Sequence, residues 1–178
     1  MTDNPAHDEE PFREPPPTLS DPRELLLGFL DCYREVIARK LSGLPEGELR
    51  RSRLPSGWTP LGLVKHLVYM ERRWVQWGFR GEAVEDPWGD QRPVGTWHVE
   101  PDETAQELIA ALQAEGTRTR AIVEPASLEN RAASGGRFNP ADEHPTLGWI
   151  LFHVLQEYVR HAGHLDIARE LADGSTGE

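Results

Sequence analysis

The sequence predicts an all-α protein in which four helices form a bundle. Apolar residues recur at helical spacing in four separate segments, and two of these segments carry clear helix-start signals. No stretch alternates apolar and polar residues persistently enough to demand a sheet. The connections between the helices are long, which is unusual in a simple bundle and often marks functional loops. At 178 residues, the chain is long enough for one domain with a real core.

The N-terminal segment, residues 1–20, is expected to be an irregular arm. It is rich in proline and in acidic residues, with too little apolar content to form a core of its own. The bundle domain is therefore expected to span residues 21–175.

The first two helices follow from spacing and start signals. The first is expected from Asp21 to Leu41, where apolar residues recur at helical spacing. The second is expected from Thr59 to about Trp77. Thr59 is a good N-cap, Pro60 suits the first helical position, and a glycine follows Trp77.

The last two helices follow from similar signals. The third is expected over residues 101–124, with acids in its first turn and apolar residues along one side. The fourth is expected to begin at Thr146, directly after Pro145, and to fade in the final segment, residues 172–178. The long connections place loops of functional length between the second, third and fourth helices.

The overall charge excludes two classes of partner. The net charge of −11 argues against nucleic acid or an anionic membrane, because phosphate binding needs a basic surface.

No apolar run approaches the roughly 18 to 20 residues that span a bilayer. The N-terminus also lacks the basic start and apolar stretch of a signal peptide, so a cytoplasmic location is expected.

The fourth helix carries ionisable residues inside its apolar face. Two heptad rows are apolar at their ends and ionisable in the middle. These rows are Leu147, Val154, His161 and Ala168, and Ile150, Glu157, His164 and Leu171. Glu157, His161 and His164 fall within a narrow arc of the helix, with His153 at its edge. Because burying such groups unpaired costs several kcal/mol, a compensating partner is expected.

A divalent metal ion would satisfy these groups, because it accepts carboxylate oxygen and imidazole nitrogen together. Glu157 and His161 are four residues apart, which lets two side chains on one helix close on the same ion. A third ligand is expected from the second helix, where His66 lies midway among apolar residues. The alternative is a hydrogen-bonded polar core without metal.

Other residues with metal-binding or nucleophilic side chains suit a structural role. A single cysteine excludes a disulfide framework and a multi-cysteine zinc site, and Cys32 is expected in the core. His7 lies in the arm, whereas His98 and His144 lie in loops. These three histidines are expected to face solvent and not to ligate.

The stretches "SGWTPLGLVKHLVYMERRW" and "WILFHVLQEYVRHAGHLDIARELADG" resemble the DinB superfamily of metal-binding four-helix bundles. The similarity covers about residues 20–175. The branch most like this chain includes the mycothiol-dependent maleylpyruvate isomerases and actinobacterial mycothiol-transferase-like proteins. The resemblance implies an up-down-down-up bundle and a divalent metal, zinc foremost and nickel second. The positions that match the ligands of the isomerases are His66, Glu157 and His161, with His164, one turn beyond, as an alternative or additional ligand.

The resemblance also implies a thiol-dependent reaction. Relatives use the metal-bound thiolate or water as a nucleophile, so a mycothiol-type S-transferase or related enzyme is expected. Its co-substrates would be a low-molecular-weight thiol and a small electrophile. The oligomeric state stays open, with a homodimer as one option. His164 and His153 are the candidate catalytic residues for proton transfer. The alternatives are a non-catalytic, stress-associated metal-binding bundle and an interaction module with a metal-free polar core.

Overall fold

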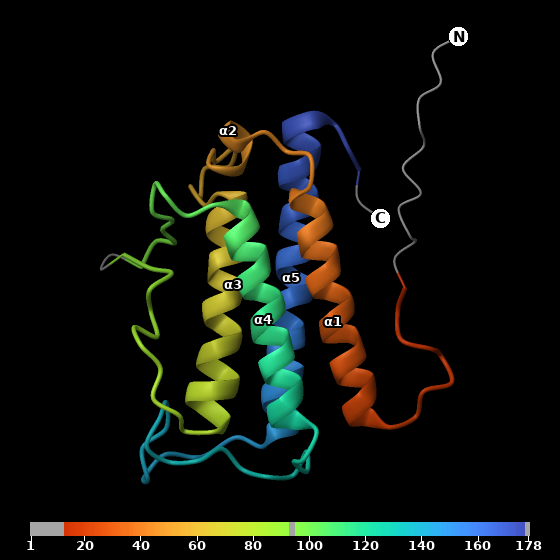
Figure 1. Ribbon diagram of the computed structural model, residues 1–178, viewed down its shortest axis with the longest axis vertical. Helices are drawn as coiled ribbons and strands as arrows, with labels where there is room; N and C mark the ends of the chain where they lie inside the picture. The colour runs from red at the N-terminus through yellow and green to blue at the C-terminus, as the bar shows by residue number, and fades with distance from the viewer. Residues whose placement is uncertain (1–12, 93–94, 177–178) are drawn as a thin grey trace.

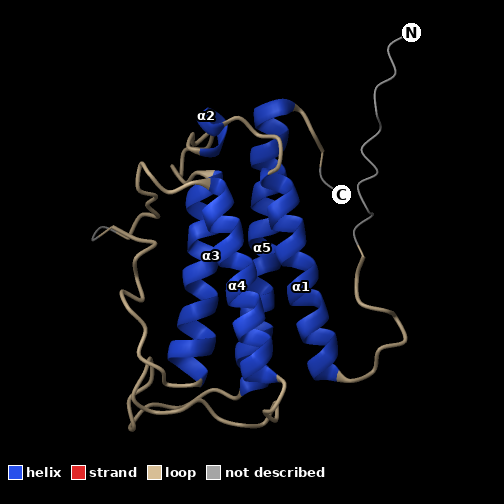
Figure 2. Ribbon diagram, in the orientation of Figure 1, coloured by secondary structure: helices blue, strands red, loops and turns tan. Residues whose placement is uncertain are grey.

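A computed structural model describes residues 13–92 and 95–176. These residues contain helices and loops but no strand, which confirms the all-α prediction (Figure 2). The helices are α1 (Pro22–Leu41), α2 (Glu46–Leu49), α3 (Pro60–Trp74), the π-helical turn η1 (Val75–Phe79), α4 (Ala105–Val123) and α5 (Leu147–Asp173). The sequence did not indicate the four-residue helix α2 or the π-helical turn.

The four long helices lie side by side, with α2 at one end (Figure 1). In that view α1 and α5 run upward, whereas α3 and α4 run downward. Helix α1 packs against α4 and α5, and α3 packs against the same two helices. Because α3 and α4 run in the same direction, residues 80–104 must return along the length of the bundle before α4 begins. This long loop provides the cover of the site described below.

Side-chain caps fix where the helices start. The side chains of Asp21, Thr59 and Thr146 accept hydrogen bonds from backbone N–H groups in the first turns of α1, α3 and α5, as expected for N-caps. Helix α4 begins four residues later than the predicted residue 101. Thr104 caps it in a reciprocal capping box with Glu107, so the preceding acids lie in the loop.

The buried face of α5 departs from the predicted heptad rows. Leu147, Ile150 and Val154 are fully buried, but Leu171 is 48% exposed. A straight α-helix drifts by about 20° per heptad, so the predicted row rotates by roughly 60° over the three heptads from Ile150 to Leu171. Leu165 is buried at that end of the helix instead.

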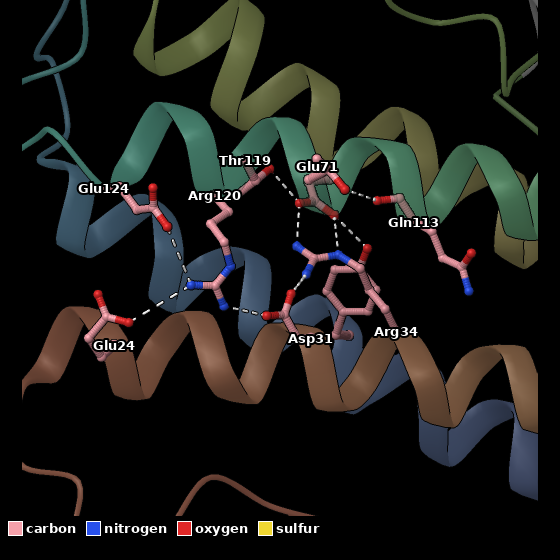
Figure 3. A network of polar contacts seen from close by, with 10 residues as sticks. Glu24, Asp31, Arg34, Glu71, Gln113, Thr119, Arg120 and Glu124 are labelled. Atoms are coloured by element: carbon pink, nitrogen blue, oxygen red, sulfur yellow. Dashed lines mark hydrogen bonds and ion pairs between the residues drawn. The ribbon is translucent and has the colours of Figure 1, made fainter.

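A buried polar network ties the four long helices together (Figure 3). The carboxylate of Glu71 on α3 accepts hydrogen bonds from Arg34 on α1 (Nε, 3.1 Å), Thr119 on α4 (2.5 Å) and the Tyr158 hydroxyl on α5 (2.6 Å). Glu71 and Tyr158 are fully buried. Because each helix supplies a member, the network fixes the relative positions of α3 and α5, the two helices that carry the candidate ligands.

The described part of the N-terminal segment, residues 13–20, contains a turn but no helix. Pro15 lies against Gly28 of α1, where a Cβ would come within 2.8 Å of the proline ring. Residues 1–12 of the predicted arm, including His7, fall outside the described residues. No helix in the described part of the chain is long and apolar enough to cross a membrane.

Candidate metal centre

The three predicted metal ligands come together between α3 and α5. Each of His66, Glu157 and His161 offers a ligand atom, and these atoms all lie within 4.8 Å of one another. Glu157 Oε2 is 3.2 Å from His161 Nε2 and 4.0 Å from His66 Nε2. Two imidazoles and one carboxylate form a common ligand set for a catalytic zinc ion, so the donor chemistry fits a divalent metal.

The electrostatics of Glu157 and His161 favour the protonation states that a metal requires. The contact with His66, followed by the charge of His161, outweighs burial and lowers the pKa of Glu157 to about 2. Burial, together with the charge of His66, lowers the pKa of His161 to about 4. At neutral pH Glu157 is therefore ionised and His161 is neutral, as ligation demands.

Asp90 orients His66 from behind. This fully buried aspartate accepts a hydrogen bond from His66 Nδ1 (3.0 Å) and is held by two hydrogen bonds from Arg73. Burial lowers the pKa of His66, but its interactions with Asp90 and Glu157 outweigh burial and raise that pKa overall. With Nδ1 donating to Asp90, Nε2 of His66 is the atom left to face Glu157. Carboxylate–histidine pairs of this kind commonly fix the tautomer of a metal ligand.

Trp97 covers the candidate site. Its ring stacks on His66 at 4.4 Å between centroids and meets His161 edge-on at 5.3 Å. Trp97 and Asp90 both belong to the loop between α3 and α4, in which His98 N donates to Asp90 O and a bridge joins Gln91 to Trp97. The folding of this loop brings both side chains onto His66.

Sequence reasoning missed Asp90 and Trp97. The chain has 30 acidic residues and six tryptophans. Nothing in the order of the loop residues marks these two as buried beside a histidine. The available signal was the length of the loop, which indicated function but not which residues carry it.

The predicted catalytic histidines flank the three candidate ligands and stand outside the group. Nε2 of His153 lies 4.0 Å from Glu157 Oε1, and its ring contacts the rings of both Trp74 and Trp149. Burial lowers the pKa of His153. His164 contacts the other side of the site, with Nδ1 3.2 Å from His161 Nδ1.

The remaining histidines and the cysteine lie apart from the site. His98 is partly buried and interacts with Glu100, whereas both ring nitrogens of His144 contact backbone carbonyl oxygens. The prediction that they face solvent is therefore wrong in detail, because each is only partly exposed. Neither belongs to the group of candidate ligands. Cys32 is buried, and burial raises the pKa of its thiol, which suits a core residue.

A known protein family matches almost the whole helical region of the chain. The chain matches the family model of mycothiol-S-transferases over residues 25–174, from the first turn of α1 to the residue after α5. No curated protein matches the chain. The family match confirms the resemblance to the DinB superfamily. The chain belongs to the mycothiol-S-transferase family.

Proposed function

We propose that the protein is a divalent-metal-dependent S-transferase that joins a mycothiol-type thiol to a small electrophile. The family match supports the transferase class. The observation that carries the metal dependence is the convergence of His66, Glu157 and His161 from two helices within 4.8 Å. A non-catalytic metal-binding bundle is the alternative that the experiment below must exclude.

His66, Glu157 and His161 would hold the ion, with zinc foremost and nickel second. Three protein ligands leave a further coordination position open for a thiol. When bound, the ion supplies a Lewis acid that lowers the pKa of a thiol or of water.

The surrounding side chains would orient the ligands and limit the access of water. Asp90 holds the Nδ1–H tautomer of His66, and Arg73 keeps Asp90 charged and in place. Trp97 covers the imidazoles of His66 and His161. A dry, pre-oriented site strengthens electrostatic interactions within it.

The proton that leaves the thiol requires an acceptor. His153 is the first candidate, because burial lowers its pKa and keeps the ring neutral at neutral pH, with Nε2 4.0 Å from Glu157. His164 is the second candidate, on the opposite side of the site beside His161. We therefore propose these two histidines as the proton acceptors.

We also propose a specific order of helix directions for the bundle. The directions of α1, α3, α4 and α5 support a DinB-like up-down-down-up bundle. Residues 21–175 would form this single domain, preceded by an arm of residues 1–20. The long loop between α3 and α4 would then be a consequence of the topology as well as a cover for the site.

The test combines metal analysis with turnover. Protein purified without chelator or nickel resin is analysed for metals. Thiol consumption is then followed with mycothiol and a chlorinated nitroaromatic, with and without added zinc. His161→Ala should lose metal and turnover, because removal of a direct ligand should cost at least the 10- to 100-fold in affinity lost when a supporting residue is changed. His98→Ala removes an imidazole outside the group and should behave like the wild type.

Two results would count against the proposal. Undiminished turnover by metal-free His161→Ala protein would defeat the metal-dependent mechanism. Stoichiometric metal in the wild type, without turnover of mycothiol or any other thiol, would favour the non-catalytic metal-binding bundle.

A further inference from the structure

Arg137 lies in the loop between α4 and α5, and its backbone is held firmly against η1. Arg137 N donates to Trp77 O at 3.0 Å, and Ala133 N donates to Phe79 O at 2.9 Å. Gly136 packs so closely that a Cβ would lie 2.0 Å from Trp77 O. The position of Arg137 is therefore fixed by the surrounding backbone.

Among the residues that the structure describes, the guanidinium of Arg137 has aromatic neighbours but no counter-charge. It lies 4.0 Å from the centroid of the Trp74 ring and 5.9 Å from that of Trp88. In the described ranges, 13–92 and 95–176, no carboxylate lies within ion-pair distance of it and no hydrogen bond reaches its side chain. Burial lowers the pKa of Arg137, and the like charge of Arg73 lowers it further. Arg34 and Arg73, by contrast, each bind a buried carboxylate.

One chain of contacts leads from Arg137 to Glu157. Trp74, which carries the guanidinium on its ring, also contacts His153 at 4.4 Å between centroids. His153 in turn lies 4.0 Å from Glu157. Arg137 therefore stands two side chains from a candidate metal ligand.

A second chain of contacts leads to His66 by another route. The ring of Trp88 contacts two guanidinium groups. That of Arg137 lies 5.9 Å from the ring centroid, and that of Arg73 lies 4.4 Å from it. Arg73 binds Asp90, which binds His66. Because the two routes end on different helices, they place Arg137 beside the packed pair of α3 and α5, toward the η1 end. Trp74 is two turns of α3, about 12 Å along the axis, from His66.

Two exposed tryptophan rings lie near Arg137. Trp88 is 45% exposed and Trp149 is 52% exposed. Trp149 stacks nearly parallel on His153, with 6° between the planes. Large aromatic faces beside a cation with no acid partner suit a planar molecule that bears an anionic group.

We propose that Arg137, Trp74 and Trp149 form the subsite for the electrophilic co-substrate, and that this co-substrate is an aromatic carboxylate. The carboxylate would bind the guanidinium, and the aromatic ring would lie along the tryptophans with its reactive carbon toward the candidate metal centre. The catalytic consequence rests on the proposed transferase function, whereas the binding of the anion does not.

The reaction used as a test is a displacement at an aromatic carbon. The thiolate sulfur of mycothiol attacks the chlorine-bearing carbon of 4-chloro-3-nitrobenzoate and a C–S bond forms. The C–Cl bond breaks, and chloride leaves with the electron pair. The proton released from the thiol passes to His153 or His164, the acceptors proposed above, and then to solvent. The displacement involves no net oxidation or reduction, so no oxidant or reductant is required. The neutral comparison substrate is 4-chloro-3-nitrobenzamide.

Binding is measured first, without chemistry or metal. Chelator-treated protein is titrated with 3-nitrobenzoate and with neutral 3-nitrobenzamide, and quenching of tryptophan fluorescence is followed. Arg137→Gln should weaken binding of the benzoate about 10- to 100-fold, the range expected for a lost charge-assisted hydrogen bond, and should leave the amide little changed. Arg137→Lys should retain part of the preference. Arg131→Gln, an exposed change in the same loop, should match the wild type.

Kinetics then separate the subsite from the transferase. Arg137→Gln should lower kcat/KM for the chlorobenzoate about 10- to 100-fold, mainly through KM, with little effect on the amide. If turnover occurs but Arg137→Gln treats the acid and the amide as the wild type does, the subsite is wrong and the transferase stands. If benzoate binding depends on Arg137 but no thiol is turned over, the subsite stands and the transferase falls. Equal benzoate binding by the wild type, Arg137→Gln and Arg137→Lys would overturn the inference.

Discussion

At the scale of single residues, the candidate site includes side chains that are not themselves candidate metal ligands. His66 has a defined tautomer because Asp90 accepts from Nδ1, and Asp90 stays charged because its contacts with His66 and Arg73 outweigh burial and lower its pKa. Fixing a ligand in advance removes the free-energy cost of ordering it when the ion binds. The buried aspartate is therefore as much a part of the candidate centre as the residues that would touch the metal.

Asp90→Asn should weaken zinc binding about 10- to 100-fold, because the amide no longer offers His66 a charged acceptor. Zinc affinity is measured by competition with a chromophoric chelator, on protein shown to be folded. Asp86→Asn, in the same loop, is the matched control. Asp86 has a left-handed backbone (φ 39°), which asparagine tolerates. Wild-type affinity in Asp90→Asn would refute the orienting role.

His144 should make folding stability depend on pH. Its ring nitrogens contact the carbonyl oxygens of Asn139 and Ala132, and these contacts raise the pKa of His144 above its ordinary value. Because the folded pKa is raised, the extra stability is fully present below the unfolded pKa of about 6.5 and is lost as pH rises through the folded value. Urea midpoints measured from pH 5 to 9 should show this decline in the wild type. The urea midpoint of His144→Gln should decline less over this range. If the midpoint fell by the same amount in the variant as in the wild type, His144 would not be the source of the pH dependence.

At the scale of helices and loops, polar contacts hold the elements that carry the ligands. Glu71 receives hydrogen bonds from the three other long helices, and the loop after α4 is clamped to η1 by its backbone. Neither arrangement touches the candidate metal centre directly. Both determine where α3, α5 and Arg137 stand relative to it.

Glu71→Gln should destabilise the bundle by about 3 to 5 kcal/mol, because it leaves the buried charge of Arg34 without its full counter-charge. Tyr158→Phe should cost less, about 1.5 to 3 kcal/mol, since it removes a single hydrogen bond to a charged acceptor. Both free energies of unfolding come from urea titration followed by circular dichroism. A smaller loss for Glu71→Gln than for Tyr158→Phe would show that the ion pair does not dominate the network.

Gly136→Ala should displace the loop that carries Arg137, because its Cβ would lie 2.0 Å from a backbone oxygen that cannot move aside. Overpacking of this kind costs about 1 to 3 kcal/mol. Gly135→Ala, where no atom lies within 4 Å of the added Cβ but the backbone has φ of 101°, separates backbone strain from the clash. Thermal denaturation measures both losses, and an unperturbed Gly136→Ala protein would contradict the close packing.

At the scale of the whole molecule, the candidate centre joins helices that are distant in the chain. His66 belongs to α3, whereas Glu157 and His161 belong to α5. An ion bound by all three would therefore stabilise the bundle as a unit and not one helix alone.

Zinc should raise the free energy of unfolding by about 2.7 kcal/mol at a free concentration 100 times its dissociation constant. The check is a pair of thermal scans, in zinc and in chelator, for the wild type and for His161→Ala. The wild type should melt higher in zinc, whereas the variant should show little difference. An equal shift in the variant would place the stabilising ion elsewhere.

The sequence by itself determined the four long helices and the candidate ligands. Caps such as Thr59 and Thr146 are local signals, because the side chain binds the backbone of its own first turn. The Glu157 and His161 pair is equally local, since four residues of helix bring two side chains to one face. His66 was identifiable because a histidine among apolar residues of a core helix needs a polar partner.

The tertiary structure alone decided what surrounds those residues. Asp90, Trp97 and Arg137 lie in loops without periodicity, so their positions depend on how residues 80–104 and 124–146 cross the bundle. The heptad rows also placed Leu171 on the buried face, whereas the true period of the helix turns it outward. Local geometry is set within one or two helical turns and can be read from spacing. The partners of a buried charge are set by long-range packing, for which the order of residues in one chain carries no comparable signal.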